Sequence, residues 1–327
     1  MLQICGARGR RFAALILMAL AGYASAQQAY PDRPVRIIVP YAPGSSLDVL
    51  GRLVGQKLSG ILGQPVIVDN RPGGNTVIGS EALVKSPPDG YTLLLVVNTH
   101  AIIPNLLPAL PYDAIRDFAP VATVTSTELV LVLHPSVPAN SLQEFIALAK
   151  ARPGQLNYAS AGSGSTTHLA AEMFNMMAGV RMQHIPYKGA GPALTDLVGG
   201  QVQLFFTAPI VTIPYIKTGK LKVIAISGET RLPSLPQVPT FSEAGLPGFD
   251  VKVWYGVLAP AGTSKAIIER LSSGLAKVMA MTDFKESLVS QGMEPFVSTP
   301  EQFGALIRAD VAKYAKVIKS AGIKMEE

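Results

Sequence analysis

The 327-residue sequence predicts an α/β fold of two Rossmann-like domains, joined by a two-strand hinge with a ligand cleft between them. Three observations support this. A strand, a glycine- and serine-containing loop, a helix and a second strand occur twice in the same order. Two apolar extended segments, 129–133 and 251–258, lie where the chain would pass between the copies. The 301 residues after position 26 exceed what one hydrophobic core usually serves.

The first copy is predicted from hydrophobic periodicity and turn residues. A run of apolar residues gives a buried strand, Pro43 and Gly44 end it, and apolar side chains then recur at helical spacing. The expected elements are, in order, strand 35–39, helix 49–61, strand 66–68, a turn at 71–74, a helix ending near residue 85, a turn at 87–90 and strand 91–97.

The second copy repeats this order without comparable residue identity. It is expected to contain helix 142–150, strand 156–159, the loop 160–165, a helix carrying Leu169, Met173, Phe174 and Met177, and strand 182–186. The two α/β units therefore share a plan.

The domain boundaries follow from the two crossing segments. Domain 1 is predicted to comprise residues 27–128 and 251–327, and domain 2 residues 129–250. The last third reads as helical, with an apolar stripe over 264–281 and a capping box at 299–302 that has proline at its first helical position. These helices are expected to cover domain 1. Two crossing strands without a covalent clamp describe a hinge around a cleft.

The first 26 residues are typical of a signal peptide. Three arginines precede an apolar run from Phe12 to about Gly22, and small residues at 24–26 end it. A membrane anchor would need about 20 apolar residues, and this run has roughly half that number. We expect cleavage after Ala26, release into the periplasm and no direct membrane insertion of the mature chain. Either the general secretory route or the twin-arginine route fits Arg10 and Arg11.

The composition excludes several classes of protein. Cys5 is the only cysteine and lies before the cleavage site, so the mature chain has no disulfide or thiolate chemistry. Residues 27–327 carry 25 Lys plus Arg and 22 Asp plus Glu, without the basic stripe that nucleic-acid binding needs. The four histidines show no metal-ligand spacing, and no motif for catalysis, phosphate or dinucleotide binding occurs. We expect no metal, no cofactor and no enzyme activity.

Two short loops are candidates for anion binding. The loop 43–46 and the loop 161–165 each follow a predicted strand and precede a helix, whose first N–H groups and dipole favour an anion. The alternative is that Ser46, and Ser165 or Thr166, are ordinary N-caps. Asp48 fits that alternative, since an acid in the first turn would repel an anionic ligand, and His168 fits a packing or capping role.

The sequence resembles one family over essentially its whole mature length. The matching stretches, in fixed order, are Tyr30-Pro31-x-Arg33-Pro34-Val35, Val39-Pro40-Tyr41-Ala42-Pro43-Gly44 with Asp48, Leu62-Gly63-Gln64-Pro65, Asn70-Arg71-Pro72-Gly73, Pro88-Asp89-Gly90-Tyr91-Thr92-Leu93, Tyr112-Asp113 with Asp117-Phe118, Ser160-Ala161-Gly162-x-Gly164-Ser165 with His168-Leu169, Pro186-Tyr187-Lys188-Gly189, Pro239-Thr240 with Glu243-Ala244-Gly245, and Ala259-Pro260-Ala261-Gly262. In these stretches the chain is similar to the tripartite tricarboxylate transporter receptors, also called the Bug family.

The resemblance implies a periplasmic-binding-protein fold of type II, a small organic carboxylate as ligand and the membrane permease of the same transport system as partner. The receptor would be a monomer. It also implies which residues face the ligand across the cleft: Tyr41, Gly44, Ser45 and Ser46 from one loop, Asn98, Thr99 and His100 from a second, and Ser160, Gly162, Ser163, Ser165 and Thr166 from a third.

The sequence departs from the family pattern at three positions. Ser45 replaces a glycine and Ser163 an asparagine, and both changes keep a small polar residue. Thr207 stands where family members often have aspartate, so we expect this end of the pocket to select a dicarboxylate over a ligand with an ammonium group. Two other functions remain open at this point: a sensory receptor for a membrane kinase, and a secreted hydrolase or lyase that uses His168 or a serine.

Overall fold

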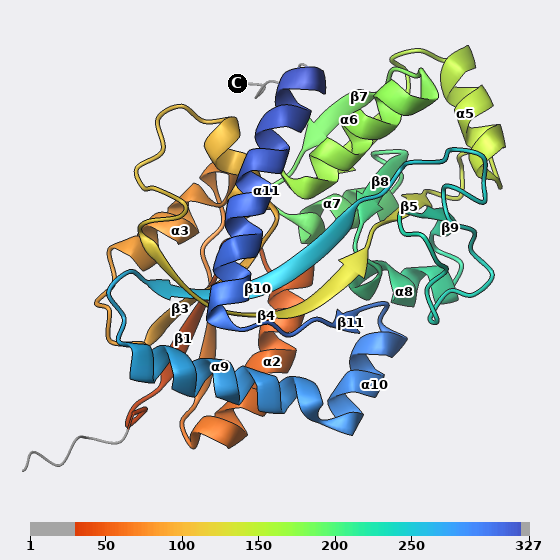
Figure 1. Cartoon of the computed structure of the whole chain (residues 1–327). Helices are drawn as coiled ribbons and strands as arrows, with labels where there is room; N and C mark the ends of the chain where they lie inside the picture. The colour runs from red at the N-terminus through yellow and green to blue at the C-terminus, as the bar shows by residue number, and fades with distance from the viewer. Residues whose placement is uncertain (1–29, 322–327) are drawn as a thin grey trace, which may run out of the picture.

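The computed structural model describes residues 30–321, which fold into two lobes (Figure 1). The predicted signal peptide, residues 1–26, lies outside the described residues. No helix among residues 30–321 combines the length and the apolar character that a membrane span requires.

The first lobe is built on a six-stranded sheet with the strand order β11-β4-β10-β3-β1-β2. Strands β1 and β2 are parallel neighbours, β1 also pairs in parallel with β3, and β10 runs antiparallel between β3 and β4. The strand bounds are β1 Val35–Val39, β2 Val66–Asn70, β3 Thr92–Val97, β4 Phe118–Glu128, β10 Lys252–Pro260 and β11 Glu294–Pro295.

The second lobe is built on a five-stranded sheet with the order β7-β6-β8-β5-β9. Strand β6 lies parallel to β7 and to β8, whereas β5 runs antiparallel to β8 and β9. The bounds are β5 Val130–Leu133, β6 Asn157–Ser160, β7 Gln183–Pro186, β8 Leu204–Thr207 and β9 Lys222–Ile226.

The two sheets share one plan, as the sequence predicts. The order β2-β1-β3-β10 in the first lobe corresponds to β7-β6-β8-β5 in the second, with three parallel strands followed by one antiparallel strand in each. In each sheet the antiparallel strand belongs to a segment of chain that has just crossed from the other lobe. This exchange gives the two-lobed type II architecture and places the ends of the parallel strands of both sheets at the boundary between the lobes.

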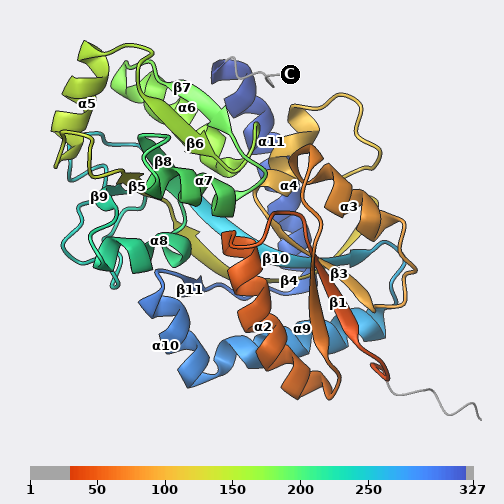
Figure 2. The same ribbon diagram turned by 180° about the vertical axis from the view of Figure 1, so that it is seen from behind.

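The helices and short 3₁₀ turns cover both faces of the sheets (Figure 2). Their bounds are α2 Ser46–Leu62, η1 Gly74–Thr76, α3 Val77–Val84, α4 Thr99–Ile102, η2 Ile103–Asn105, α5 Leu142–Ala151, α6 Thr166–Ala178, α7 Ala190–Val198, α8 Pro209–Lys217, α9 Lys265–Ala280, α10 Thr282–Ser290 and α11 Pro300–Ala321.

The chain crosses between the lobes at the ends of β4 and β10. The sequence predicts one crossing strand at 129–133, but the structure has β4 end at Glu128 and β5 begin at Val130. The crossing segments are tied together by Ser227, whose hydroxyl donates to the Val251 carbonyl at 2.7 Å and accepts from the Leu129 N–H at 2.8 Å. Hydrogen bonds through Ser227 thus hold this hinge region together.

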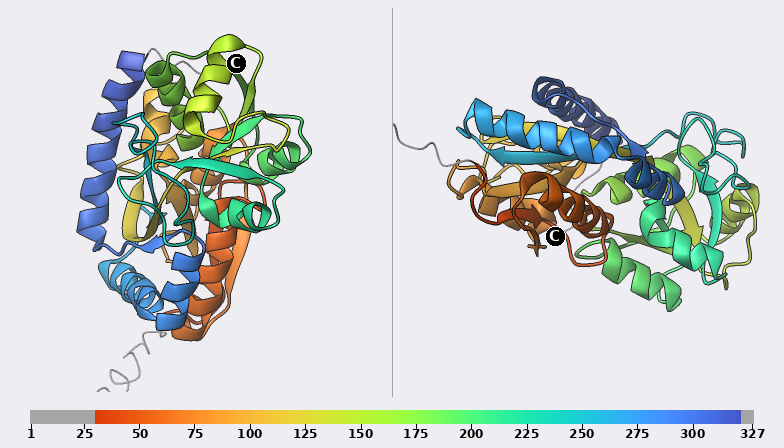
Figure 3. Two further views of the ribbon diagram at one scale, coloured as in Figure 1. Left: turned by 90° about the vertical axis from the view of Figure 1, so that its right-hand side faces the viewer. Right: turned by 90° about the horizontal axis from the view of Figure 1, so that it is seen from below.

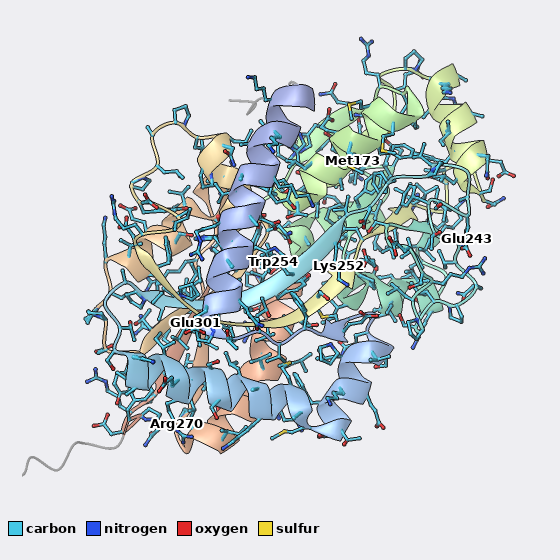
Figure 4. All side chains as sticks on the ribbon, in the orientation of Figure 1. Met173, Glu243, Lys252, Trp254, Arg270 and Glu301 are labelled. Carbon is cyan, nitrogen blue, oxygen red and sulfur yellow. The ribbon has the colours of Figure 1, made fainter. Side chains whose placement is uncertain are left out.

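The C-terminal helices pack mainly on the first lobe, as predicted. Helix α9 packs against α2 and β4, and α11 runs across β4 and α4 and reaches α6 of the second lobe (Figure 1). The predicted capping box at the start of α11 is present, because the Thr299 N–H donates to Gln302 Oε1 at 2.9 Å and the Gln302 N–H to Thr299 Oγ1 at 3.2 Å. Trp254 of β10 lies under α11 (Figure 4) and donates from Nε1 to Asp310 Oδ2 at 2.7 Å.

Candidate functional site

A small cavity lies between the two lobes, which sit side by side when viewed from below (Figure 3). Its volume is about 40 Å³, and we call it the site cavity. It is bounded by the β1–α2 loop, the end of β3, the start of α6, the end of β8 and strand β10. The predicted site residues that line it are Tyr41, Ser45, Ser46, Thr99, Ser165, Thr166 and Thr207.

The first-lobe side of the site cavity is the N-terminus of α2. Ser45 is the N-cap residue, and its hydroxyl accepts from the Asp48 N–H at 3.2 Å, while Asp48 Oδ2 accepts from the Gly44 N–H at 3.0 Å. Gly44 needs a positive φ of 77° at this point. The expectation that Ser46 could be the cap is therefore wrong, because Ser46 is the first helical residue and its side chain is available to the cavity.

Asp48 places a negative charge in the first turn of α2. Its other oxygen, Oδ1, pairs with Arg52 at 2.8 Å. Burial alone would raise the pKa of Asp48, but the hydrogen bonds from Arg52 and Gly44 outweigh that effect and lower the pKa below its ordinary value. Asp48 is thus ionised and offsets the positive end of the α2 dipole.

The second-lobe side of the site cavity is the N-terminus of α6, and its hydrogen bonds match those of α2. The Ser165 hydroxyl accepts from the His168 N–H at 3.3 Å, and His168 Nδ1 accepts from the Gly164 N–H at 3.0 Å. The capping role anticipated for Ser165 and His168 is confirmed. Because Nδ1 accepts a backbone proton, the ring is the neutral tautomer with its proton on Nε2.

Thr166 carries the clearest sign of a missing partner. It is the first residue of α6, it is 5% exposed, and its Oγ1 has no hydrogen-bond partner. A buried hydroxyl without a partner costs about 1–3 kcal/mol, so such groups are rare in folded proteins. Since Thr166 lines the site cavity, an acceptor bound there would satisfy it.

Thr99 connects the two lobes across the site cavity. Its Oγ1 accepts from the Tyr41 hydroxyl at 2.9 Å and from the Thr166 N–H of the other lobe at 3.4 Å. Burial raises the pKa of Tyr41 to about 12, although the hydrogen bond to Thr99 lowers it in part, so Tyr41 remains a neutral donor. The cavity is therefore surrounded by hydroxyl and N–H groups of both lobes.

No residue lining the site cavity, within the part of the chain that the structure describes, is Asp, Glu, Lys, Arg or His. Its polar groups are the hydroxyls and the N-termini of α2 and α6, and the remaining wall is largely apolar. An anion can be held there by dipoles and hydroxyl donors alone. A cationic group in the same space would have no acidic side chain in the cavity lining to balance it, which costs several kcal/mol.

Six predicted site residues lie outside the lining of the site cavity. Gly44 donates its N–H to Asp48, and Gly162 and Ser163 belong to the loop between β6 and α6 but do not line the cavity. Ser160 is the last residue of β6, and its hydroxyl accepts from the Gly162 N–H at 3.1 Å and bonds to His184 Nε2 at 2.6 Å. These four residues shape the loops without bordering the cavity.

The other two, Asn98 and His100, point toward α11 and the core. The Asn98 amide accepts from the Trp254 N–H at 3.0 Å and donates to the Tyr314 hydroxyl at 3.2 Å. His100 Nε2 is 2.9 Å from the Ala114 carbonyl, and its ring packs edge-on against Phe118. Their neighbour Thr99 is the one residue of this loop that borders the cavity, because three consecutive side chains at a helix start cannot point the same way.

A stack of three rings supports the second-lobe loop from below. His168 stacks on His184 with ring centroids 4.1 Å apart, and His184 stacks on Tyr158 at 5.0 Å. Burial lowers the pKa of His184 to about 4. Through Ser160 and Gly164 the two imidazoles hold both ends of the loop that leads into α6.

The lobes meet closely beside the site cavity. The Ala42 N–H donates to the Lys188 carbonyl at 3.2 Å across the boundary. A Cβ on Gly191 would lie 2.3 Å from the Pro43 carbonyl oxygen, and Gly191 has an ordinary φ. Glycine is required at Gly191 by this contact between backbones, which exists only when the lobes are together.

Several lining residues escaped prediction from the sequence. Tyr255 and Val253 of β10, Leu129 at the crossing and Ala190 at the start of α7 border the site cavity. Tyr255, Val253 and Leu129 come from the segments in which the chain crosses between the lobes, and Ala190 from the helix after β7. Nothing in their local pattern distinguishes them from ordinary core residues. No group of three or more His, Cys, Asp or Glu side chains with metal-binding geometry occurs within residues 30–321.

Comparison with known proteins identifies related chains. The family model described as "Tripartite tricarboxylate transporter family receptor" matches residues 50–323. BugT of Bordetella pertussis is 38% identical over 315 residues, a match that covers 95% of this chain and 97% of BugT.

Solved structures agree with this result. A protein of R. palustris, solved with adipate, is 33% identical, covers 91% of this chain and all of its own chain, and superimposes with a TM-score of 0.88. MatC of Rhodopseudomonas palustris, solved with bound malate, is 32% identical with a TM-score of 0.83, covering 88% of this chain and all of MatC. The matching family model describes receptors of a transporter and not enzymes.

Proposed function

Because this chain belongs to the tripartite tricarboxylate transporter receptors, a family of periplasmic solute-binding proteins, we propose that it captures a small organic dicarboxylate between its two lobes. Captured ligand would be passed to the integral membrane permease of the same system. The mature receptor is proposed to begin after Ala26, to act in the periplasm as a monomer and to contain no cofactor.

The observation that carries the proposal is the unpartnered Thr166 hydroxyl at the start of α6. It lies in a cavity whose lining offers hydroxyl and N–H donors and no acid, among the residues described. A carboxylate oxygen accepts from such donors, and each charge-assisted hydrogen bond contributes about 1.5–3 kcal/mol. Four or five of them suffice for a micromolar complex, near −8 kcal/mol, even after the costs of association.

The absence of an ammonium group in the ligand is proposed from Thr207. This residue is 1% exposed at the end of β8, borders the site cavity and has a hydroxyl where an acid would be needed to balance a cation. The related R. palustris proteins, solved with adipate and with malate, support a carboxylate without an ammonium group.

A panel of ligands tests the proposal. Succinate, malate, adipate, aspartate and glutamate are titrated by calorimetry, and the melting temperature is recorded with each, since a ligand that binds only the folded state raises it. We expect one or more of the three dicarboxylates without an ammonium group to bind, and more tightly than either amino acid. Tighter binding of aspartate or glutamate would overturn the assignment of Thr207.

A matched pair of glycine variants tests capture by closure. Gly191→Ala places a methyl group against the Pro43 carbonyl and should weaken ligand binding at least tenfold with little change in melting temperature, because the lobes can no longer meet. Gly60→Ala, in α2 with nothing within 4 Å of the added carbon, is the control and should bind normally. Equal affinity of both variants would mean that the ligand does not require closure.

A further inference from the structure

A second cavity adjoins the site cavity at the boundary between the lobes. Its volume is about 100 Å³, and we call it the side cavity. We propose that the side cavity is a second subsite, which receives the far carboxylate of a dicarboxylate ligand and contacts it through Asn75 and Lys188. This inference rests on the proposed function, in which the first carboxylate occupies the site cavity.

The size of the site cavity requires a second space. A cavity volume of about 10–15 Å³ accommodates one water molecule. The 40 Å³ of the site cavity therefore holds a group of roughly three heavy atoms, which is the size of a carboxylate. A dicarboxylate of four to six carbons does not fit in it. The side cavity shares Tyr41 and Ala161 with the site cavity, and it is the larger of the two.

The charge of the side cavity suits an anion. Lys188 lines it, is exposed, and forms no ion pair with any residue that the structure describes. No Asp or Glu is among the described residues that line the side cavity, and Asp196, which accepts from the hydroxyl of the lining residue Tyr187 at 2.7 Å, does not itself line it. Lys188 therefore supplies a cation that the site cavity lacks, at a position where a second carboxylate would arrive.

The backbone of the facing turn is held in an unusual conformation. Asn75 and Thr76 have φ values of 51° and 77°, which cost a non-glycine residue about 1–2 kcal/mol each. They follow Gly73 and Gly74, so four consecutive residues have positive φ. Such strain persists only where surrounding contacts fix the turn, and here the turn forms one wall of the side cavity.

Asn75 reaches across to the second-lobe loop. A Cβ added to Gly162 would lie 2.9 Å from Asn75 Oδ1, so the amide packs on the backbone of the loop that leads into α6. An amide at this position has N–H groups that can donate to a carboxylate. The side cavity thus presents polar groups of both lobes, among them Asn75 of the first and Lys188 of the second, and a ligand that spans both cavities would contact both lobes at both ends.

Pairs of ligands that differ by one carboxylate distinguish binding in the side cavity from binding in the site cavity. Adipate is compared with hexanoate, and succinate with butyrate, by calorimetry on the wild type, Lys188→Gln and Asn75→Gly. Asn75→Gly removes the amide and adopts the positive φ without strain. Lys220→Gln is the matched control, since Lys220 is an exposed lysine of the same lobe outside both cavities.

We expect the preference of the wild type for the dicarboxylate over its monocarboxylate partner to fall about tenfold in Lys188→Gln and about threefold in Asn75→Gly, and to stay constant in Lys220→Gln. An unchanged preference in Lys188→Gln, with wild-type-like binding of the dicarboxylate, overturns the second subsite and leaves the proposed function standing. If the wild type binds neither member of either pair and does not bind malate, the proposed function itself fails.

Discussion

The N-termini of α2 and α6 face each other across the site cavity with the same local structure and different charges. In each, a glycine with φ of 77° precedes a serine N-cap, and the side chain three residues after the serine accepts from the glycine N–H at 3.0 Å. That side chain is Asp48 in the first lobe and His168 in the second.

This single difference assigns the two helix ends different roles. The Asp48 carboxylate offsets the α2 dipole, whereas the neutral His168 ring closes the same hydrogen bond and leaves the α6 dipole uncompensated. The unpartnered Thr166 hydroxyl lies at the α6 end. In the proposed complex, α6 would therefore attract the carboxylate, and α2 would supply uncharged hydroxyl donors from Ser45 and Ser46 against a small opposing charge.

His168→Asp should remove most of this difference and have the largest effect on binding. The new carboxylate would resemble Asp48 and lie near the bound anion. Two like charges about 5 Å apart repel by about 3 kcal/mol at an effective dielectric constant of 20, so affinity should fall about 100-fold by calorimetry. His168→Asn keeps an acceptor without the charge and serves as the control. Equal losses in the two variants would contradict an electrostatic origin.

Acid should destabilise the second-lobe loop. The folded pKa of His184 is about 4 and that of an unfolded histidine about 6.5, so between these values the unfolded chain binds more protons. The contribution of His184 to the free energy of unfolding is fully present above about pH 6.5. About 2 to 3 kcal/mol of it is lost as the pH falls to about 4. Melting curves at pH 7 and pH 4.5 for the wild type and His184→Gln measure it. Parallel losses in both proteins would show that His184 does not contribute.

Much of this comparison is visible in the sequence. The repeated order of strand, loop and helix, the capping residue Ser165 and the capping box at 299–302 follow from patterns within ten residues of each other. Such patterns predict hydrogen bonds between residues that are close in the sequence, and these hydrogen bonds are present in the structure.

The features that could not be predicted from the sequence depend on the direction in which side chains point and on the path of the chain between the lobes. Thr99 borders the site cavity while its neighbours Asn98 and His100 point into the core, although all three were expected there. Strand β4 shows no alternation of polar and apolar residues, because it is covered on both faces, and its role in the crossing was missed. Tyr255 reaches the cavity only because the chain returns to the first lobe as β10.

Thr166→Val tests the role of the α6 N-terminus by removing a single hydroxyl group. Valine has the shape of threonine without the hydroxyl, so the variant should fold at least as stably, since it deletes a buried group without a partner. Ligand affinity should fall about tenfold, which is the low end of the value of a hydrogen bond to a charged group. Melting and titration of the same sample separate the two effects. Normal affinity would place the carboxylate away from α6.

The charge difference between the two helix ends is tested most directly by removing the opposing charge. Asp48→Asn keeps an oxygen for the Gly44 N–H and leaves Arg52 without its carboxylate partner. A charge in the first turn of a helix contributes about 0.3–1 kcal/mol. Titration calorimetry with a dicarboxylate should therefore show that Asp48→Asn binds about two- to fivefold more tightly than the wild type. The melting temperature of the variant should be lower. Weaker or unchanged binding would contradict the assignment of attraction to α6 and opposition to α2.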